Sequence, residues 1–373
     1  MKRQIMRTWA EVDLGRIRAN IASIRSSLPD GVRFMGVVKA NAYGHGAVPV
    51  AKTMEEAGAD YLAVACLNEA IELREGGVRL PILILGITPP EFAYELEEYD
   101  IAQAVSSLDY AERLNAGLRR PICAHIKFET GMGRTGFCAA SAKQMEEAKK
   151  ALSLPKLDFR GAFTHFSVSD EPEQESFTFE QARRFEAAVS EAEKSMGKAF
   201  ELKHCANTGA VINYPQLALD MVRPGVAVYG MYPAAEHGAL ELSPALSLRS
   251  RIYAINEHTA GDTISYGRTF TASHDMLVAV VPIGYADGLH RALSGKLEVL
   301  VRGRRCRQIG RICMDMCMVD VTDLPECCVG DIVTLIGSDG DEQVLASELA
   351  EKAGTINYEI TCALSERVPR VYT

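Results

Sequence analysis

The sequence predicts an α/β barrel of the (β/α)8 type followed by a smaller all-β domain. Eight short apolar runs between residues 33 and 222 are separated by segments long enough for helices. Eight βα units in roughly 240 residues are what such a barrel requires. After about Pro233 the helical periodicity largely disappears, and short strands with turn signals take over. A doubly wound sheet would show the same alternation, so strand counting alone leaves that alternative open.

The first predicted helix has one apolar face. Ile17, Ile21, Ile24 and Leu28 are spaced four, three and four residues apart, and Pro29 ends the helix. The barrel strands are then predicted at 33–39, 61–65, 81–85, 101–105, 124–128, 160–165, 201–205 and 218–222. Helical segments lie between them, and the clearest are 139–152 and 179–194.

The barrel domain is predicted to span 1–237 and the β domain 238–373. Within the β domain we expect strands at 248–256, 276–281, 297–302, 318–321 and 331–336, with one short helix near 345–352. The segment before the first helix, about 1–12, also resembles a strand. We expect this strand to pack on the β domain rather than on the barrel.

Composition excludes several classes of partner. The formal charge is −9, which argues against nucleic acid or an anionic membrane. No apolar run approaches the ~20 residues that a membrane span needs, and residues 1–4 lead into no apolar signal-peptide segment. The ten cysteines lack paired CxxC spacing. We therefore expect a cytoplasmic protein with reduced thiols and no metal site.

Lys39 is the most informative single residue. It closes an apolar run and is followed by a turn of small and polar residues, 40–46. A lysine at the end of a buried strand is rare because desolvating an ammonium group is costly. The same desolvation lowers the pKa of the amine and makes it a nucleophile suited to Schiff-base formation with a carbonyl. On position alone, a lysine that snorkels to the surface is an equal alternative.

Other polar residues follow the remaining predicted strands. Active sites of (β/α)8 barrels lie at the C-terminal ends of the strands. The residues at these ends are Lys39, Lys127, Arg134, His165, Asn207, Thr208, Arg223 and Gly225. A histidine at a strand end, or an isolated Arg-Pro-Gly turn, is more often structural. Their joint occurrence predicts one polar site at this end of the barrel.

The loop 131–136 matches the pattern G-x-G-x-x-G. A dinucleotide-binding fingerprint belongs in the first βα turn of its sheet, whereas this loop follows the fifth predicted strand. The sequence therefore does not predict a dinucleotide site here.

The run from Val37 to Gly46 resembles the pyridoxal-phosphate (PLP) lysine segment of the alanine racemase family. The similarity covers nearly the whole chain in order, because it recurs near Arg134, His165, Arg223, Tyr266, Asp315 and Tyr358. The resemblance implies a PLP-dependent enzyme that interconverts L- and D-alanine. It also implies a homodimer and a supply of D-alanine for bacterial peptidoglycan.

The resemblance assigns the barrel residues to the cofactor and the substrate. It implies phosphate contacts from Tyr43, Asn207, Thr208 and Gly225, a stacking role for His165, and substrate and cofactor contacts from Arg134. The family's lysine at the position of Lys127 can be carbamylated. Arg223 would face the pyridine nitrogen. Because arginine has no acceptor and stays charged, this nitrogen would remain unprotonated, which weakens the cofactor as an electron sink.

Racemisation removes a proton from one face of Cα and delivers one to the other. Two acid–base groups on opposite faces are the simplest design. The resemblance implies Lys39 for one face and Tyr266, supplied by the other subunit, for the other. Free tyrosine has a pKa near 10, so Tyr266 would need cationic neighbours or hydrogen bonds to act as a base.

Four further residues match segments that surround the substrate in the family. Met314 and Asp315 resemble residues near the substrate carboxylate. Tyr285 and Tyr358 resemble groups that narrow the entrance, and Tyr358 is also assigned to the cofactor site. A narrow site would favour the methyl side chain of alanine.

Two alternatives use the same cofactor. PLP-dependent barrel decarboxylases of basic or diamino acids share the strand-end lysine and a β domain, but their residue from the other subunit is typically a cysteine. Tyr266 argues against that class. Non-catalytic PLP-binding barrel proteins lack a β domain, and the residues beyond Pro233 disfavour them.

Overall fold

The computed structural model describes residues 6–233 and 240–373, which form two compact units. The barrel unit contains Ile17–Ala42 and the described part of Ala47–Ser243. The β unit contains the described residues up to Arg16, together with Tyr43–Gly46 and Pro244–Thr373. The predicted boundary between residues 237 and 238 lies outside the described residues, as do residues 1–5 of the predicted N-terminal strand.

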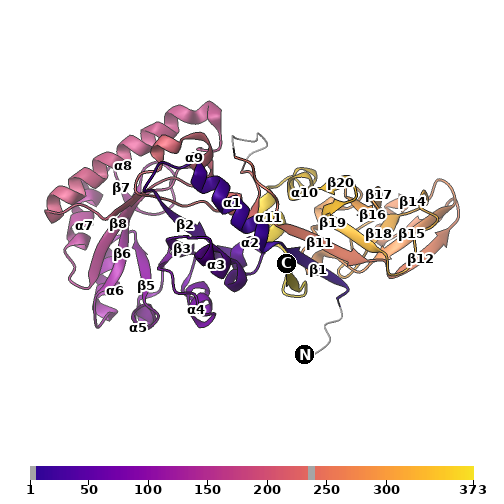
Figure 1. Ribbon diagram of the computed structural model, residues 1–373, viewed down its shortest axis with the longest axis horizontal. Coiled ribbons are helices and arrows are strands. Elements are labelled where there is room, and N and C mark those ends of the chain that lie inside the picture. Colours follow the sequence, from indigo (N-terminus) through magenta and orange to yellow (C-terminus); the bar gives the residue numbers. More distant parts are fainter. Residues whose placement is uncertain (1–5, 234–239) are drawn as a thin grey trace. The chain divides into compact units, whose positions relative to one another are not determined.

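The barrel unit is built on a wall of eight parallel strands in the order β10-β2-β3-β4-β5-β6-β8-β9. Several of these strands, among them β2, β3, β5, β6 and β8, are labelled in Figure 1. Their bounds are β2 Arg33–Val37, β3 Tyr61–Val64, β4 Ile82–Ile84, β5 Ile101–Val105, β6 Ile122–Glu129, β8 Leu157–Phe163, β9 Leu202–His204 and β10 Met221–Val222; β7, Phe137–Cys138, pairs with β6. The backbone N–H of Asp220 donates to Lys203 O (3.1 Å) and nearly closes the ring. The predicted (β/α)8 barrel is confirmed.

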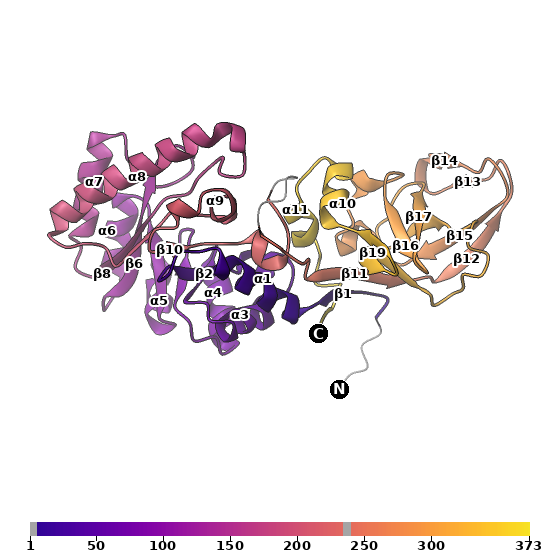
Figure 2. The same cartoon turned by 45° about the horizontal axis from the view of Figure 1, so that its top comes forward.

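Helices cover the outside of this wall, as Figures 1 and 2 both show. Helix α1, Leu14–Ser26, buries Ile17, Ile21 and Ile24 on its predicted apolar face. The others are α3 Ala47–Glu56, α4 Leu67–Glu75, α5 Ala93–Glu98, α6 Leu108–Gly117, α7 Ala142–Leu152, α8 Glu175–Met196 and α9 Thr208–Asn213. The segment labelled α2, Lys39–Tyr43, is a left-handed turn and not a right-handed helix. Helix α8 begins four residues before its predicted start.

The β unit is dominated by one ten-stranded sheet in the order β12-β15-β18-β17-β16-β19-β11-β1-β21, with β20 paired to β19. The strands are β1 Thr8–Val12, β11 Leu246–Arg251, β12 Ala254–His258, β15 Met276–Val281, β16 Glu298–Val301, β17 Arg304–Ile309, β18 Cys317–Asp320, β19 Ile332–Asp339, β20 Glu342–Val344 and β21 Arg370–Tyr372. Strand β1 pairs antiparallel with β11, so the start of the described chain belongs to this sheet.

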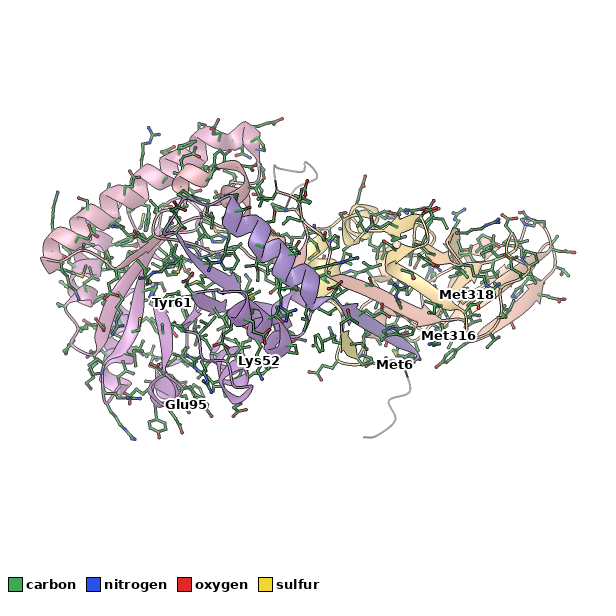
Figure 3. The ribbon with its side chains drawn as sticks, viewed as in Figure 1. Met6, Lys52, Tyr61, Glu95, Met316 and Met318 are labelled. Atoms are coloured by element: carbon green, nitrogen blue, oxygen red, sulfur yellow. The ribbon has the colours of Figure 1, made fainter. Side chains whose placement is uncertain are left out.

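A small apolar cluster lies within the β unit. Ile264, Ala272, Met276, Val278 and Ile309 are buried together, and Phe270 and Met318 pack against them. Met318 lies on β18 and is labelled in Figure 3. Burial of such side chains stabilises the sheet by about 25 cal/mol per Å² of apolar surface removed from water.

Two details of the β unit differ from the sequence prediction. The predicted strand 248–256 is two strands, β11 and β12, which are separated by Ile252 and Tyr253. The pairing partner changes there, because β11 pairs with β19 and β12 pairs with β15. A second short helix, α11, Asn357–Cys362, follows the predicted helix α10, Ala346–Ala353. Helix α11 carries Tyr358.

The described residues, 6–233 and 240–373, contain no helix long and apolar enough to cross a membrane. None of the ten cysteines, all of which lie in the described residues, forms a disulfide.

Candidate active site

Eight predicted site residues belong to the barrel unit. Lys39 and His165 each lie two residues beyond their strands, β2 and β8, and Arg223 directly follows β10. Asn207, Thr208 and Gly225 lie in the segments just beyond β9 and β10, Lys127 lies within β6, and Arg134 lies in the loop after it. Because the strands are parallel, their C-terminal ends open onto one face of the barrel.

Arg223 is the buried centre of this group, with only 4% of its surface exposed. Its guanidinium donates to Nδ1 of His204 (2.8 Å) and to the carbonyls of Thr164 (2.7 Å) and Cys205 (3.2 Å), and lies 3.5 Å from Nδ1 of His165. Burial lowers the pKa of Arg223 to about 10, so it stays charged at neutral pH. These acceptors are carbonyls and imidazoles. None of them carries a negative charge that would neutralise the guanidinium directly.

His204 and His125 extend this network, and sequence reasoning missed both. Arginine can only donate, so Nδ1 of His204 accepts and its Nε2 carries the proton. That Nε2 lies 2.8 Å from Nδ1 of His125 and donates to it. Burial and the nearby Arg223 lower the pKa of His125 to about 3 and that of His204 well below its ordinary value. The two imidazoles are therefore neutral, with fixed tautomers.

His165 is also neutral. Burial is the main cause of its low pKa, and the positive charges of Arg223, Arg134, Lys127 and Lys39 lower it further. A neutral, flat imidazole in this position is suited to stacking on an aromatic ring. The electrostatic effect of Lys39 on His165 also places the strand-end amine within the same group of residues.

Lys127 is a buried lysine whose ammonium group donates to Thr135 Oγ1 (2.6 Å). Burial, followed by the positive charges of Arg134 and Arg223, lowers its pKa to about 8. Its neighbour Arg134 is placed by Glu129, whose carboxylate accepts from the backbone N–H of Arg134 (3.2 Å). The amine of Lys127 thus lies in a positively charged environment and is easily deprotonated.

The loops after β9 and β10 are joined by a hydrogen bond. The backbone N–H of Gly225 donates to Thr208 Oγ1 (2.9 Å). Asn207 Oδ1 accepts from the N–H of Ala210 (3.0 Å) and from the hydroxyl of Ser169 (2.6 Å). The hydroxyl and amide groups of these loops can bind a phosphate, as the corresponding loops do in many (β/α)8 barrels.

The turn after Lys39 is left-handed. Ala40, Asn41 and Ala42 have φ of 52–53° and ψ of 47–52°, and Tyr43 has φ of 53°. This conformation costs roughly 1–2 kcal/mol per residue in a left-handed helix of L-amino acids. Such strain persists only where surrounding contacts maintain it, and it is concentrated at functional sites.

Tyr43 and Tyr358 lie together in the β unit. Their ring centroids are 5.9 Å apart, with the planes tilted by 49°. Burial, followed by the neighbouring Tyr358 and Cys362, raises the pKa of Tyr43 well above its ordinary value. Its hydroxyl therefore stays protonated and can donate a hydrogen bond.

Tyr266 lies at the surface of the β unit, with 71% of its surface exposed. It begins the short 3-10 helix η5, Tyr266–Arg268. The preceding residue, Ser265, has φ of 69°, and its hydroxyl donates to Arg311 O (2.7 Å). A Cβ atom added at Gly267 would lie 3.3 Å from the guanidinium carbon of Arg311. This arginine therefore packs against the turn that contains Tyr266 and Gly267.

Tyr285 and Met314 lie on two loops that are held together. The backbone N–H of Tyr285 donates to Cys313 O, and that of Ala286 donates to Met314 O (both 3.0 Å). Gly284 makes this approach possible, since a Cβ there would lie 2.2–2.3 Å from the same two carbonyl oxygens.

Ion pairs secure these loops to both ends of the described chain. The fully buried carboxylate of Asp287 accepts from Arg7 (2.5 Å) and lies 3.5 Å from Arg367. Arg367 also donates to Asp315 (2.7 Å), and Arg7 donates to the carbonyl of Asp315 (3.2 Å). Arg7 and Asp287 are 280 residues apart in sequence, so no local pattern could have revealed their pairing.

The chain matches two family models over most of its length. Residues 12–233 match the alanine racemase N-terminal domain, and residues 245–372 match the alanine racemase C-terminal domain. A curated relative, alanine racemase 1 of Clostridium acetobutylicum, is 43% identical over 378 residues, covering 100% of this chain and 97% of the relative. The alanine racemase of Desulforamulus reducens is also 43% identical, covering 98% of each chain.

Solved structures show the same similarity over the whole chain. Alanine racemase from Clostridium difficile 630 has a TM-score of 0.93 and 40% identity, covering 99% of this chain and 97% of the other. The enzyme from Bacillus anthracis, solved with bound L-Ala-P, has a TM-score of 0.94 and 40% identity, covering 99% and 96%. The resemblance predicted from the sequence is confirmed: the chain belongs to the alanine racemase family and is a racemase, an isomerase that acts on amino acids.

Proposed function

We propose that this chain interconverts L- and D-alanine with PLP, and that Lys39 and Tyr266 serve opposite faces of Cα. The proposal rests on the position of Lys39. Its amine follows the end of β2 and belongs to the same group of residues as the buried guanidinium of Arg223, whose hydrogen-bond acceptors are uncharged. Racemisation of L-alanine in D2O, with the position of deuterium followed in both enantiomers, tests it.

The residues of the barrel unit fit PLP, the cofactor on which this family depends. The amine of Lys39 can hold an aldehyde covalently, and the neutral ring of His165 can pack against an aromatic ring. Arg223 can donate to a pyridine nitrogen without protonating it. The Thr208 and Gly225 loops, with Asn207, can bind the phosphate. By family resemblance we also assign Tyr43, which belongs to the β unit, as a phosphate donor. When bound, PLP supplies an electron-accepting ring that stabilises negative charge at Cα.

The remaining assignments concern proton transfer and substrate binding. Lys39 Nζ takes or returns the α-proton on one face, and the phenolic oxygen of Tyr266 does so on the other. By family resemblance, Arg134 and the Met314–Asp315 segment bind the substrate carboxylate. Tyr285 and Tyr358 line the entrance, and we propose that they exclude side chains larger than methyl.

Arg223 should suppress transamination, in which the amino acid leaves as a keto acid. Replacing it by Glu places a carboxylate opposite the ring nitrogen, which favours protonation and a longer-lived negative charge at Cα. We expect Arg223→Glu to raise pyruvate formation per racemisation event at least about tenfold, equivalent to ~1.4 kcal/mol. A coupled assay for pyruvate measures this effect. Arg223→Lys, which keeps the charge, is the control, and an unchanged pyruvate ratio in Arg223→Glu would refute the assignment.

We propose that Lys127 is carbamylated. Its pKa of about 8 leaves part of the amine neutral near pH 7, and neutral amine is the form that attacks carbon dioxide. The new N–C bond forms with loss of one proton, and the resulting anion offsets the charges of Arg134 and Arg223. After incubation with 13C-bicarbonate, wild-type protein should show a carbamate 13C resonance that Lys127→Ala lacks. Identical spectra for the two proteins would exclude the modification.

We propose that Tyr266 acts in the partner subunit of a homodimer. Its high exposure on the β unit suits a residue that completes another molecule's site, and two-fold symmetry would then create two composite sites. A purified heterodimer of Lys39→Ala and Tyr266→Phe subunits would contain one doubly altered site and one intact site. We expect about half of wild-type activity, although each parent homodimer is inactive.

The matched control is a heterodimer of wild-type and doubly substituted subunits. If Tyr266 acts across the interface, each of its sites carries one substitution, and it should be inactive. The reverse pattern, with this control active and the first heterodimer inactive, would show that Tyr266 acts within its own subunit.

We further propose that the enzyme is cytoplasmic and supplies D-alanine for peptidoglycan. The ten cysteines, none of which forms a disulfide, support a reducing compartment. Depletion of the protein in its bacterial host should produce growth that depends on added D-alanine, and growth without it would contradict this role.

A further inference from the structure

We propose that Glu69 is a positioning residue for Lys39, and that its carboxylate maintains the left-handed turn after Lys39. The inference rests on the proposed role of Lys39 as the acid–base group for one face of Cα. Glu69, Lys39 and the first three residues of that turn, Ala40 to Ala42, all belong to the barrel unit.

The carboxylate of Glu69 bridges two loops of the barrel. Oε1 accepts from the backbone N–H of Ala40 (2.6 Å), in the turn that follows β2. Oε2 accepts from the backbone N–H of Ala65 (2.7 Å), directly after β3. The contact with Ala65 is local, because Glu69 lies in the first turn of α4 and reaches back to the segment just before that helix. The contact with Ala40 crosses to another βα unit and has no such local explanation.

Other hydrogen bonds restrain the left-handed turn beyond its first residue. Further along, Ala42 N–H donates to Val38 O (2.9 Å), and Asn41 Oδ1 accepts from Ala47 N–H (2.7 Å). At the first position, the amide of Ala40 donates to Glu69. Since neither alanine nor asparagine prefers this conformation over the right-handed one, loss of that bond should let the start of the turn relax.

This bond acts on Lys39 directly. The N–H of Ala40 belongs to the same planar peptide unit as the carbonyl of Lys39. Fixing the direction of that N–H fixes the rotation of the peptide plane about the Cα–C bond of Lys39. The direction in which the Lys39 side chain leaves the backbone follows from it. A charge-assisted bond is well suited to this task because it is shorter and stronger than a bond between neutral groups.

The surroundings of Glu69 predict that its removal displaces the Lys39 side chain but does not prevent folding. Ala40 and Ala65 are exposed, so water can replace the carboxylate when Glu69 is removed. The fold should therefore survive substitution, while the amine of Lys39 loses its fixed position. Misplacement of a reacting group by ~1 Å can slow a reaction about 100-fold.

The test compares Glu69→Ala, Glu69→Gln and Glu72→Ala in PLP-loaded protein. Glu72 is an exposed glutamate on the same helix, and its removal makes the same change in charge. The glutamine retains one acceptor oxygen, but its NH2 group cannot accept a second N–H. Loss of the α-proton from D-alanine and from L-alanine in D2O is followed separately by NMR.

We expect Glu69→Ala to slow exchange from D-alanine, the face assigned to Lys39, by at least about tenfold. Exchange from L-alanine, the face assigned to Tyr266, should slow much less. Glu69→Gln should be intermediate and Glu72→Ala unchanged. A second readout is the rate at which cofactor-free protein recovers its covalently bound PLP absorbance, which should fall in the same order.

Equal slowing of both enantiomers, or no slowing of either, would overturn the role of Glu69. Circular dichroism separates these outcomes from misfolding, and Glu69→Gln supplies the same comparison if Glu69→Ala does not fold. Failure of the proposed function gives a different result, because wild-type protein would then exchange neither enantiomer.

Discussion

Replacement of Lys39 by alanine should abolish racemisation and covalent capture of PLP. The residue lies two positions beyond β2 at the C-terminal end of the barrel and is assigned both to hold the cofactor and to move the α-proton on one face. Loss of a general acid–base group alone typically slows a reaction by about 10²–10⁴-fold. Because both roles are lost, we expect a reduction at or beyond the upper end of this range. The measurements are the racemisation rate and borohydride reduction, followed by peptide mapping of the labelled lysine.

Lys52→Ala is the matched control for this experiment. Lys52 is an exposed lysine on helix α3 of the same unit (Figure 3), and its removal should leave both readouts unchanged. Retention of a borohydride-reducible chromophore by Lys39→Ala would show that another amine holds the cofactor.

Replacement of Tyr266 by phenylalanine should remove proton transfer on one face only. The substitution deletes the hydroxyl and keeps the ring, which is 71% exposed on the β unit, so little change in folding is expected. Loss of the α-proton from L-alanine should slow by about 10²–10⁴-fold. Exchange from D-alanine should persist because it depends on Lys39. Separate NMR measurements from each pure enantiomer in D2O give the two rates.

Tyr253→Phe controls for loss of an exposed tyrosine hydroxyl. Tyr253 lies between β11 and β12 and is 51% exposed. Both exchange rates should remain at wild-type values in this variant. Equal slowing from both enantiomers in Tyr266→Phe would argue against a role confined to one face.

Local hydrophobic patterns account for most of what the sequence predicted correctly. Strand β5, Ile101–Val105, has the predicted bounds because all five residues are buried, so the apolar run and the strand coincide. Strand β15, Met276–Val281, also has its predicted bounds, because all six of its residues are apolar. The order of such runs and of the helices between them predicted eight βα units, although a doubly wound sheet would have shown the same order.

Features that depend on contacts between distant residues were not predictable in this way. His125 and His204 are hydrogen-bonded to each other although they are 79 residues apart in sequence. Neither lies in a local sequence pattern that would identify it as a site residue. Helix α11 has only six residues, too few to show a helical period, so the structural setting of Tyr358 was missed.

The sequence predicted a turn after Lys39 but did not predict that this turn is left-handed. Gly44 and Gly46 indicated a change of direction, but Ala40 and Ala42 have no preference for positive φ. The hydrogen bonds that support this conformation include one from another βα unit, through Glu69. Only the three-dimensional structure relates Glu69 to the residue that follows Lys39.

The most direct test of the proposed mechanism is the initial reaction of wild-type, PLP-loaded protein with L-alanine in D2O. Chiral separation and NMR give the deuterium content at Cα of the substrate and the product before equilibrium. Two acid–base groups on opposite faces predict that the first D-alanine formed carries deuterium, because the group that donates the proton is not the group that removed it. D-alanine that retains the substrate's own proton would indicate one group serving both faces, and absence of both exchange and D-alanine would contradict the proposed racemisation.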